Sequence, residues 1–202
     1  LGDLGGRLRR LGAPVVVTCA RGSSDHAAAY FKYLCEITLG VPVASLGPSV
    51  ASVYGAPLRL AGAALVTISQ SGRSPDIVAL QQAAKRAGAL TIAIVNDTDS
   101  PVAHEADCLL PLQAGAEESV AATKSFIASC VAGAAITAVW AGDAALDAAV
   151  RALPVTLERA LTVDWSAAEA LVSEQSLYVL GRGPALAVAA EAALKLKETA
   201  SL

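Results

Sequence analysis

Unbroken apolar runs, rather than alternating ones, dominate the first half of the chain. The runs are rich in Val, Ile, Leu and Ala, and Gly, Ser, Asn or Pro residues bound them. Such runs are typical of parallel strands that are covered on both faces, because neither side of the strand meets water. The expected strands span residues 15–19, 41–46, 63–69, 90–96 and 108–112.

The stretches between these runs predict helices. Residues 25–39 and 74–87 have helical patterns, and each stops at a glycine, Gly40 or Gly88. Strands that alternate with helices favour the α/β class. We therefore predict a doubly wound parallel sheet that is flanked by helices and has right-handed crossovers.

The pattern changes after the last of these strands. Residues from 123 to about 163 are helical in pattern and rich in alanine, with Asp143 as the expected N-cap between two helices. An apolar run at 176–180 then precedes an Arg-Gly pair and a helix, which repeats the beginning of the chain. A lone strand cannot form a sheet, so we expect a second lobe that continues beyond Leu202. The predicted parts are a first lobe at 1–142, a helical connection at 143–174 and the start of a second lobe at 175–202.

Composition excludes several classes of function. Hydrophobic residues make up 54% of the chain, which allows a large core, and the net charge is −3 with the basic residues dispersed. Nucleic acid is therefore not an expected partner. The longest weakly polar run, residues 127–142, contains Ser129 and Thr137 and falls short of the roughly 18 strongly apolar residues that span a membrane. We predict a buried helix there and no membrane partner.

The cysteines and histidines indicate neither a disulfide framework nor a metal site. The four cysteines form no C-x-x-C motif and lie in apolar surroundings, which favours reduced core thiols and a cytoplasmic protein. The chain has only two histidines, so a histidine-rich metal site is not expected. Neither a G-x-G-x-x-G nor a P-loop motif is present, and we expect no cofactor.

The strongest chemical signal is a serine-rich segment, residues 69–74, which we call the serine loop. It closes the strand at 63–69 and opens the next helix, so its hydroxyls, one amide and free backbone N–H groups point to one place. A phosphate dianion needs this combination of neutral donors and a helix N-terminus. An ordinary N-cap at Ser74, ahead of Pro75, is the alternative. It leaves Ser69, Gln70 and Ser71 unexplained, so we favour a phosphate site.

Three other segments carry weaker signals. The first loop, residues 21–25, can add hydroxyls to the same anion, or Ser24 or Asp25 can simply cap the helix that follows. The acidic loop, residues 117–124, can wall the same pocket or place carboxylates at a helix N-terminus. Lys195 and Glu198 share a helix face, which on spacing alone favours a solvent-exposed ion pair.

Four motifs together resemble the SIS (sugar isomerase) domain family over roughly residues 14–202. They are Ala-Arg-Gly-Ser-Ser at 20–24, Ser-Gln-Ser-Gly at 69–72, Val-Ala-Ala-Thr-Lys at 120–124 and Glu-Ala-Ala-Leu-Lys-Leu-Lys-Glu at 191–198. The chain is similar to the isomerase half of glutamine–fructose-6-phosphate aminotransferases, and more so, at residues 19–27, to SIS-type glucosamine-6-phosphate deaminases. The resemblance implies a flavodoxin-like strand order.

The resemblance also implies roles for individual residues. Glu198 matches the family's general base, and the serine loop matches the phosphate site. Val120 and Ala122 match a wall that touches the sugar, although the family commonly has Ser where this chain has Ala122. The ring-opening His and the substrate-facing Lys of the family lie downstream of Leu202. The expected site comprises Glu198 as the catalytic residue and Gly22, Ser23, Ser24, Ser69, Gln70, Ser71, Ser74, Val120 and Ala122 as binding residues.

From this resemblance we expect an enzyme that converts glucosamine 6-phosphate into fructose 6-phosphate and ammonia by aldose–ketose proton transfer. The expected partners are the sugar phosphate and a second copy of the chain in a homodimer. Two alternatives remain open. One is a sugar-phosphate sensor without catalysis, which can dispense with Glu198. The other is the isomerase part of an aminotransferase, which needs a glutaminase domain upstream.

Overall fold

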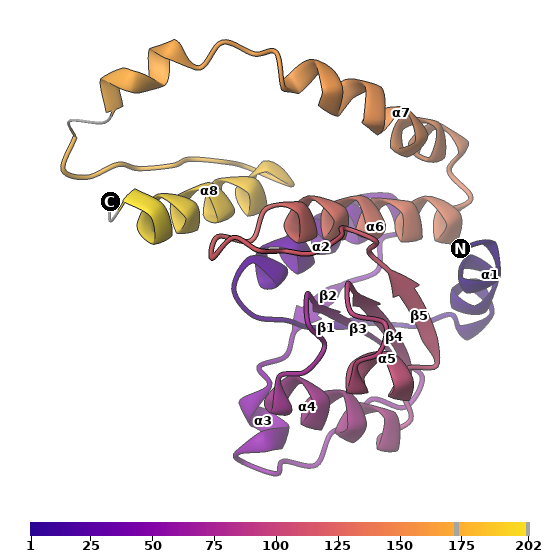
Figure 1. Cartoon of the computed structure of the whole chain (residues 1–202). Helices are drawn as coiled ribbons and strands as arrows, with labels where there is room; N and C mark the ends of the chain where they lie inside the picture. Colours follow the sequence, from indigo (N-terminus) through magenta and orange to yellow (C-terminus); the bar gives the residue numbers. More distant parts are fainter. Residues whose placement is uncertain (172–173, 201–202) are drawn as a thin grey trace.

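The computed structural model describes residues 1–171 and 174–200, and its centre is a five-stranded sheet (Figure 1). The strand order is β2-β1-β3-β4-β5, and all four pairings are parallel. This flavodoxin-like order confirms the predicted doubly wound fold. The strands are β1 (Val16–Cys19), β2 (Val43–Ser45), β3 (Ala64–Ser69), β4 (Leu90–Val95) and β5 (Cys108–Pro111).

Helices cover both faces of the sheet, and each face has its own apolar core. Along β3, Val66 and Ile68 pack into the cluster that includes Phe31, whereas Leu65 packs on the opposite side with Leu80. Both faces of this strand are therefore dry, which is why its side chains are apolar except at Thr67 and Ser69. The first face carries α1 (Gly2–Leu11), α2 (Ser23–Leu39) and α6 (Lys124–Ala141), and the other carries α3 (Ser49–Ser52), α4 (Pro75–Arg86) and α5 (Pro101–Glu105).

The strand order leaves a crevice above the middle of the sheet. The chain leaves β1 for α2 on one face, and it leaves β3 for α4 on the other. The two loops therefore diverge at the carboxyl ends of two adjacent strands. In doubly wound sheets this switch point is where ligands bind.

Helix α6 is a core helix, as the sequence predicted. Contrary to the sequence expectation, it is long and apolar enough to cross a membrane, but half of that stretch is buried. Gly133 lets α6 approach α2 closely, because a Cβ there would lie 3.1 Å from the Cβ of Phe31. Ser129 and Thr137 donate hydrogen bonds to backbone carbonyls of the preceding turn, which satisfies their hydroxyls inside the core.

The C-terminal part contains α7 (Ala144–Ala160), a 3₁₀ helix η1 (Ser166–Leu171) and α8 (Ala185–Ala200). The Asp143 carboxylate accepts hydrogen bonds from two backbone N–H groups of α7, which confirms the predicted N-cap. Helix α8 packs on α2 (Figure 1).

The strand that we expected at residues 176–180 is not formed, since the described residues from 174 to 184 contain neither a helix nor a strand. A strand needs a neighbour for its hydrogen bonds, and none of the described strands lies beside this segment. The division into two lobes and a connection stays a prediction. Residues 172–173 of that connection, and 201–202 of the second lobe, lie outside the described residues.

Candidate active site

A cleft of about 200 Å³ lies at the switch point, between the ends of β1 and β3. The first loop and the serine loop, which are far apart in the sequence, both line it. The cleft therefore collects the hydroxyl and amide groups that the sequence assigned to one anion. Its lining consists of Arg21, Ser24, Ile68, Ser69, Gln70, Ser71, Ser74 and Ile77.

Hydrogen bonds within the serine loop fix its shape. Ser69 Oγ accepts a hydrogen bond from the backbone N–H of Gly72 at 3.0 Å, and Ser71 Oγ accepts one from Arg73 N–H at 3.3 Å. Gly72 has φ 60°, a left-handed conformation that favours glycine. A Cβ at this position would also lie 2.2 Å from Ser100 Oγ. Glycine is thus required at Gly72 by both conformation and space.

The turn after β4 holds the serine loop from behind. The backbone N–H groups of Asn96 and Asp97 both donate to the carbonyl of Gln70 at 3.2 Å. Arg73 Nε donates to Asp97 Oδ2 at 2.8 Å, and its Nη2 donates to the carbonyl of Asp99 at 2.8 Å. The hydrogen bond from Arg73 lowers the pKa of Asp97. The Arg73 guanidinium therefore belongs to this support, and Arg73 is not among the residues that line the cleft.

Two helices, α2 and α4, begin at the cleft, and the N-cap of α2 differs from the sequence expectation. Helix α2 begins at Ser23 with Gly22 as its N-cap, so neither Ser24 nor Asp25 is the cap that we considered. Gly22 has φ 57°, which explains why a glycine occupies this corner. Ser74 is the N-cap of α4 as expected, but its side chain makes no capping hydrogen bond. The Ser74 hydroxyl thus lines the cleft without a role in closing the helix.

A charged cluster joins α8 to the first loop. His26 Nδ1 lies 2.7 Å from a carboxylate oxygen of Glu191, a side chain that is almost completely buried. Lys195 Nζ lies 3.3 Å from the other Glu191 oxygen and donates to Ser23 Oγ at 3.1 Å. It also donates to Glu198 Oε2 at 2.6 Å. Through Lys195, the predicted base Glu198 is thus linked to the loop that lines the cleft.

This cluster corrects the solvent-exposed interpretation for Lys195, whose side chain is only 23% exposed. Glu198 stays at the exposed end of the pair, with a side chain that is 33% exposed. Desolvation lowers the pKa of Lys195, but the hydrogen bond to Glu198 and the ion pair with Glu191 outweigh this effect and leave the pKa raised. Lys195 is therefore a cation across the neutral pH range, and it keeps a positive charge beside the Glu198 carboxylate.

The acidic loop does not reach the cleft in this structure. Val120 is 95% exposed, and neither Val120 nor Ala122 is among the residues that line the cleft. Glu117 Oε2 accepts hydrogen bonds from the backbone N–H groups of Thr123 and Ser125 and from the Ser125 hydroxyl. These bonds lower the pKa of Glu117, and the bond from the Ser125 backbone N–H has the largest effect. Glu117 thus serves the N-terminus of α6, and the sugar wall at Val120 and Ala122 stays a prediction.

Sequence reasoning gave no role to Arg21, Glu191 or His26. Arg21 Nη1 forms an ion pair of 3.0 Å with Asp76 in the first turn of α4. Glu191 had a detectable signal, because it is the one charged residue between positions 184 and 194 and stands four residues before Lys195. A lone carboxylate in an alanine-rich helix indicates a specific partner.

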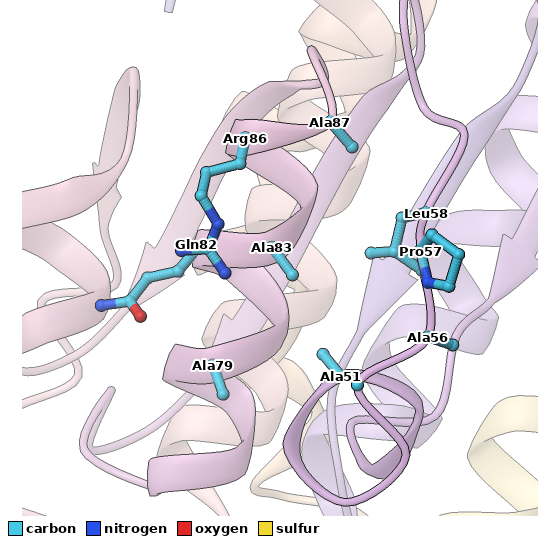
Figure 2. A pocket seen from close by; sticks show the side chains of 10 residues that line it. Ala51, Ala56, Pro57, Leu58, Ala79, Gln82, Ala83, Arg86 and Ala87 are labelled. Carbon is cyan, nitrogen blue, oxygen red and sulfur yellow. The ribbon is translucent and has the colours of Figure 1, made fainter.

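A larger hollow of about 360 Å³ lies between α3 and α4 and has a different character. Figure 2 shows small α4 side chains, such as Ala79 and Ala83, facing Ala51 and Pro57, whereas Gln82 extends away from them. Polar groups do not converge there. The cleft at the switch point is therefore the better candidate site, although it is smaller.

The described residues hold no group of three or more His, Cys, Asp or Glu side chains that could bind a metal ion. The four cysteines are free thiols. Burial, the largest effect, raises the pKa of Cys19, Cys35 and Cys130 to about 12. Such thiols are protonated at neutral pH and are weak nucleophiles. The chemistry of the site therefore depends on its hydroxyl, carboxylate and cationic groups.

The strand order and the polar cleft define a doubly wound α/β domain with its site at the switch point. A family model for the SIS domain matches residues 13–139, and the chain belongs to this family. It is 34% identical, over 95% of its length, to a glutamine–fructose-6-phosphate aminotransferase (isomerizing) from Symbiobacterium thermophilum, of which it covers 33%. The chain thus spans about a third of this curated relative.

Solved structures agree with this assignment. A candidate phosphosugar isomerase from Silicibacter pomeroyi is 50% identical, with a TM-score of 0.96, and the match covers 100% of this chain and 62% of that one. A glucosamine-6-phosphate deaminase from Thermotoga maritima gives a TM-score of 0.71 at 20% identity, over 97% of this chain and 64% of that one. The second similarity concerns the fold alone.

Proposed function

We propose that this chain supplies the phosphate site and the general base of a phosphosugar isomerase whose particular activity is the deamination of glucosamine 6-phosphate. The single observation that carries the proposal is that the first loop contacts both the serine loop and α8. The first loop and the serine loop share one cleft, and Lys195 links the first loop to Glu198. The family membership agrees with a phosphorylated sugar as the ligand.

The cleft suits a phosphate group. Ser24, Ser69, Ser71 and Ser74 bring hydroxyls to it, and Gln70 brings an amide. The cleft also lies at the N-terminus of α4, where the helix dipole favours an anion. Each hydrogen bond to a charged oxygen contributes about 1.5–3 kcal/mol.

The proposed chemistry is a proton transfer between neighbouring carbons. Glu198, as the carboxylate, removes the proton from C2 of the ring-opened amino sugar, and the proton is returned at C1. The resulting ketimine adds water and releases ammonia, which leaves fructose 6-phosphate. A positioned base contributes about 10²–10⁴-fold to such a step. Lys195 orients the Glu198 carboxylate and stabilises its charge.

The isomerase part of an aminotransferase is the second candidate, because the 34% identical relative carries that name. The two reactions share a proton transfer between C1 and C2, which they run in opposite directions, and they differ in the fate of nitrogen. A deaminase releases ammonia from glucosamine 6-phosphate. An aminotransferase uses the nitrogen of glutamine to build the amino sugar.

The test incubates the full-length protein with glucosamine 6-phosphate in the absence of glutamine and follows ammonia and fructose 6-phosphate. We expect both products in equal amounts, and we expect a Glu198→Gln variant to bind the sugar but not convert it. Conversion of fructose 6-phosphate to glucosamine 6-phosphate only with glutamine would favour the aminotransferase. Tight binding without any turnover would refute catalysis and leave a sugar-phosphate sensor.

A further inference from the structure

We propose that Arg21 is a phosphate-recognition residue and that Asp76 opposes it, so that together they set how tightly the site holds a phosphorylated sugar. This inference rests on the proposed function. Among the residues that line the cleft, Arg21 is the one charged side chain, and the others are neutral. A dianion bound in this cleft therefore meets a single positive side chain.

The position of Arg21 fits this role. It lies two residues after the end of β1, and it lines the cleft together with Ser24 and the serine loop. Its side chain is 58% exposed and is held by one ion pair, from Nη1 to Asp76 Oδ2 at 3.0 Å. A guanidinium has five N–H donors, so this contact leaves donors for a second anion. Arg21 can therefore contact Asp76 and a phosphate at the same time.

The other arginine near the site cannot substitute for Arg21. Arg73 lies within the serine loop, but its guanidinium bonds Asp97 and the carbonyl of Asp99. Breaking these bonds would release the support behind the loop. Selection between phosphorylated and unphosphorylated sugars by charge thus falls to Arg21.

Asp76 acts in the opposite direction. It lies in the first turn of α4, where a carboxylate stabilises the helix N-terminus when no ligand is bound. A phosphate at the same N-terminus is repelled by this carboxylate, and Asp76 also neutralises part of the charge that Arg21 offers. Removal of the Asp76 charge should therefore strengthen phosphate binding, whereas removal of the Arg21 charge should weaken it.

A merely structural ion pair predicts a different result. If Arg21 and Asp76 only held the first loop against α4, either substitution would loosen the cleft, and both would weaken binding. The sign of the Asp76→Asn effect separates the two explanations.

The experiment measures the dissociation constants of fructose 6-phosphate and inorganic phosphate for the full-length protein by isothermal titration calorimetry. We expect Arg21→Gln to weaken the binding of both by about ten- to a hundredfold. We expect Asp76→Asn to tighten it by about two- to tenfold, since an exposed charge pair contributes about 1 kcal/mol or less. Arg86→Gln and Asp147→Asn make the same charge changes away from the cleft and should leave affinity unchanged.

Each outcome decides one of the proposals. If the wild type binds and Ser69→Ala weakens binding, but Arg21→Gln binds like the wild type or Asp76→Asn binds more weakly, the Arg21 proposal is wrong. If the wild type binds neither ligand, or Ser69→Ala has no effect, the proposed phosphate site itself fails. Circular dichroism checks folding, and if Arg21→Gln does not fold, Arg21→Met replaces it. That variant removes the charge but keeps the length of the side chain, and wild-type affinity in it would contradict the proposal.

Discussion

The replacement of Gly72 by alanine tests whether the serine loop has the shape described above. Gly72 has φ 60°, and for an alanine this conformation costs about 1–2 kcal/mol. Its Cβ would also lie 2.2 Å from the Oγ and 2.8 Å from the Cβ of the buried Ser100. Overpacking of this kind costs a further 1–3 kcal/mol, about the range seen for extra methyl groups in packed cores. We therefore expect Gly72→Ala to lower the free energy of unfolding by about 2–5 kcal/mol.

The two contributions can be separated. Gly12 has φ 56° and no atom within 4 Å of an added Cβ, so Gly12→Ala should show the conformational cost alone, about 1–2 kcal/mol. Ser100→Gly removes both atoms that clash with the new methyl group, and as a cap replacement it costs only a few tenths of a kcal/mol. In the Gly72→Ala background, Ser100→Gly should therefore restore about 1–3 kcal/mol.

Urea unfolding of the wild type, Gly72→Ala, Ser100→Gly and the double variant, together with Gly12→Ala, measures these free energies. Titration with fructose 6-phosphate measures the effect on the cleft. We expect Gly72→Ala to weaken sugar-phosphate binding and Ser100→Gly to restore part of it. The reasoning would be refuted if Gly72→Ala were no more costly than Gly12→Ala, or if Ser100→Gly gave no recovery.

Three further predictions concern single side chains. Glu198→Gln should slow exchange of the C2 proton with solvent, followed by NMR in D₂O, by about 10²–10⁴-fold with little change in sugar-phosphate affinity, and equal losses in both would contradict a role as base. Ser69→Ala should weaken the binding of fructose 6-phosphate but not of fructose in calorimetry, and equal effects on both would remove the phosphate from the serine loop. Glu117 has a pKa below its ordinary value of 4.5, so its stabilisation of α6 is present above that pH and is lost as the pH falls through the folded-state pKa. The urea midpoint of Glu117→Gln should therefore lie below that of the wild type at neutral pH and converge with it in acid, and a constant difference would refute this linkage.

Some elements could be predicted because their local chemistry is unambiguous. The runs that became β3 and β4 are buried on both faces, and a strand in the middle of a sheet favours an apolar side chain at almost every position. Asp143 lies between two alanine-rich stretches, and an aspartate there is a strong N-cap signal. In contrast, α3 and α5 have four and five residues, too few for a helical period to show.

The sequence by itself determined that several hydroxyls and an amide stand where a strand passes into a helix at the serine loop. A strand end and a helix start are local features, and the donors belong to adjacent residues. The sequence also placed Glu198 within a family motif. Both inferences needed only neighbours along the chain or a resemblance.

Only the tertiary structure decided which distant groups meet. His26 contacts Glu191 across 165 positions of sequence, and Lys195 reaches Ser23 across 172. The pairing of Arg21 with Asp76 likewise depends on β1 lying beside β3. Helical spacing reports contacts within one helix, whereas these contacts arise from the packing of α8 on α2 and from the order of the strands. For that reason Lys195 looked like a surface residue in the sequence and is a half-buried link in the folded chain.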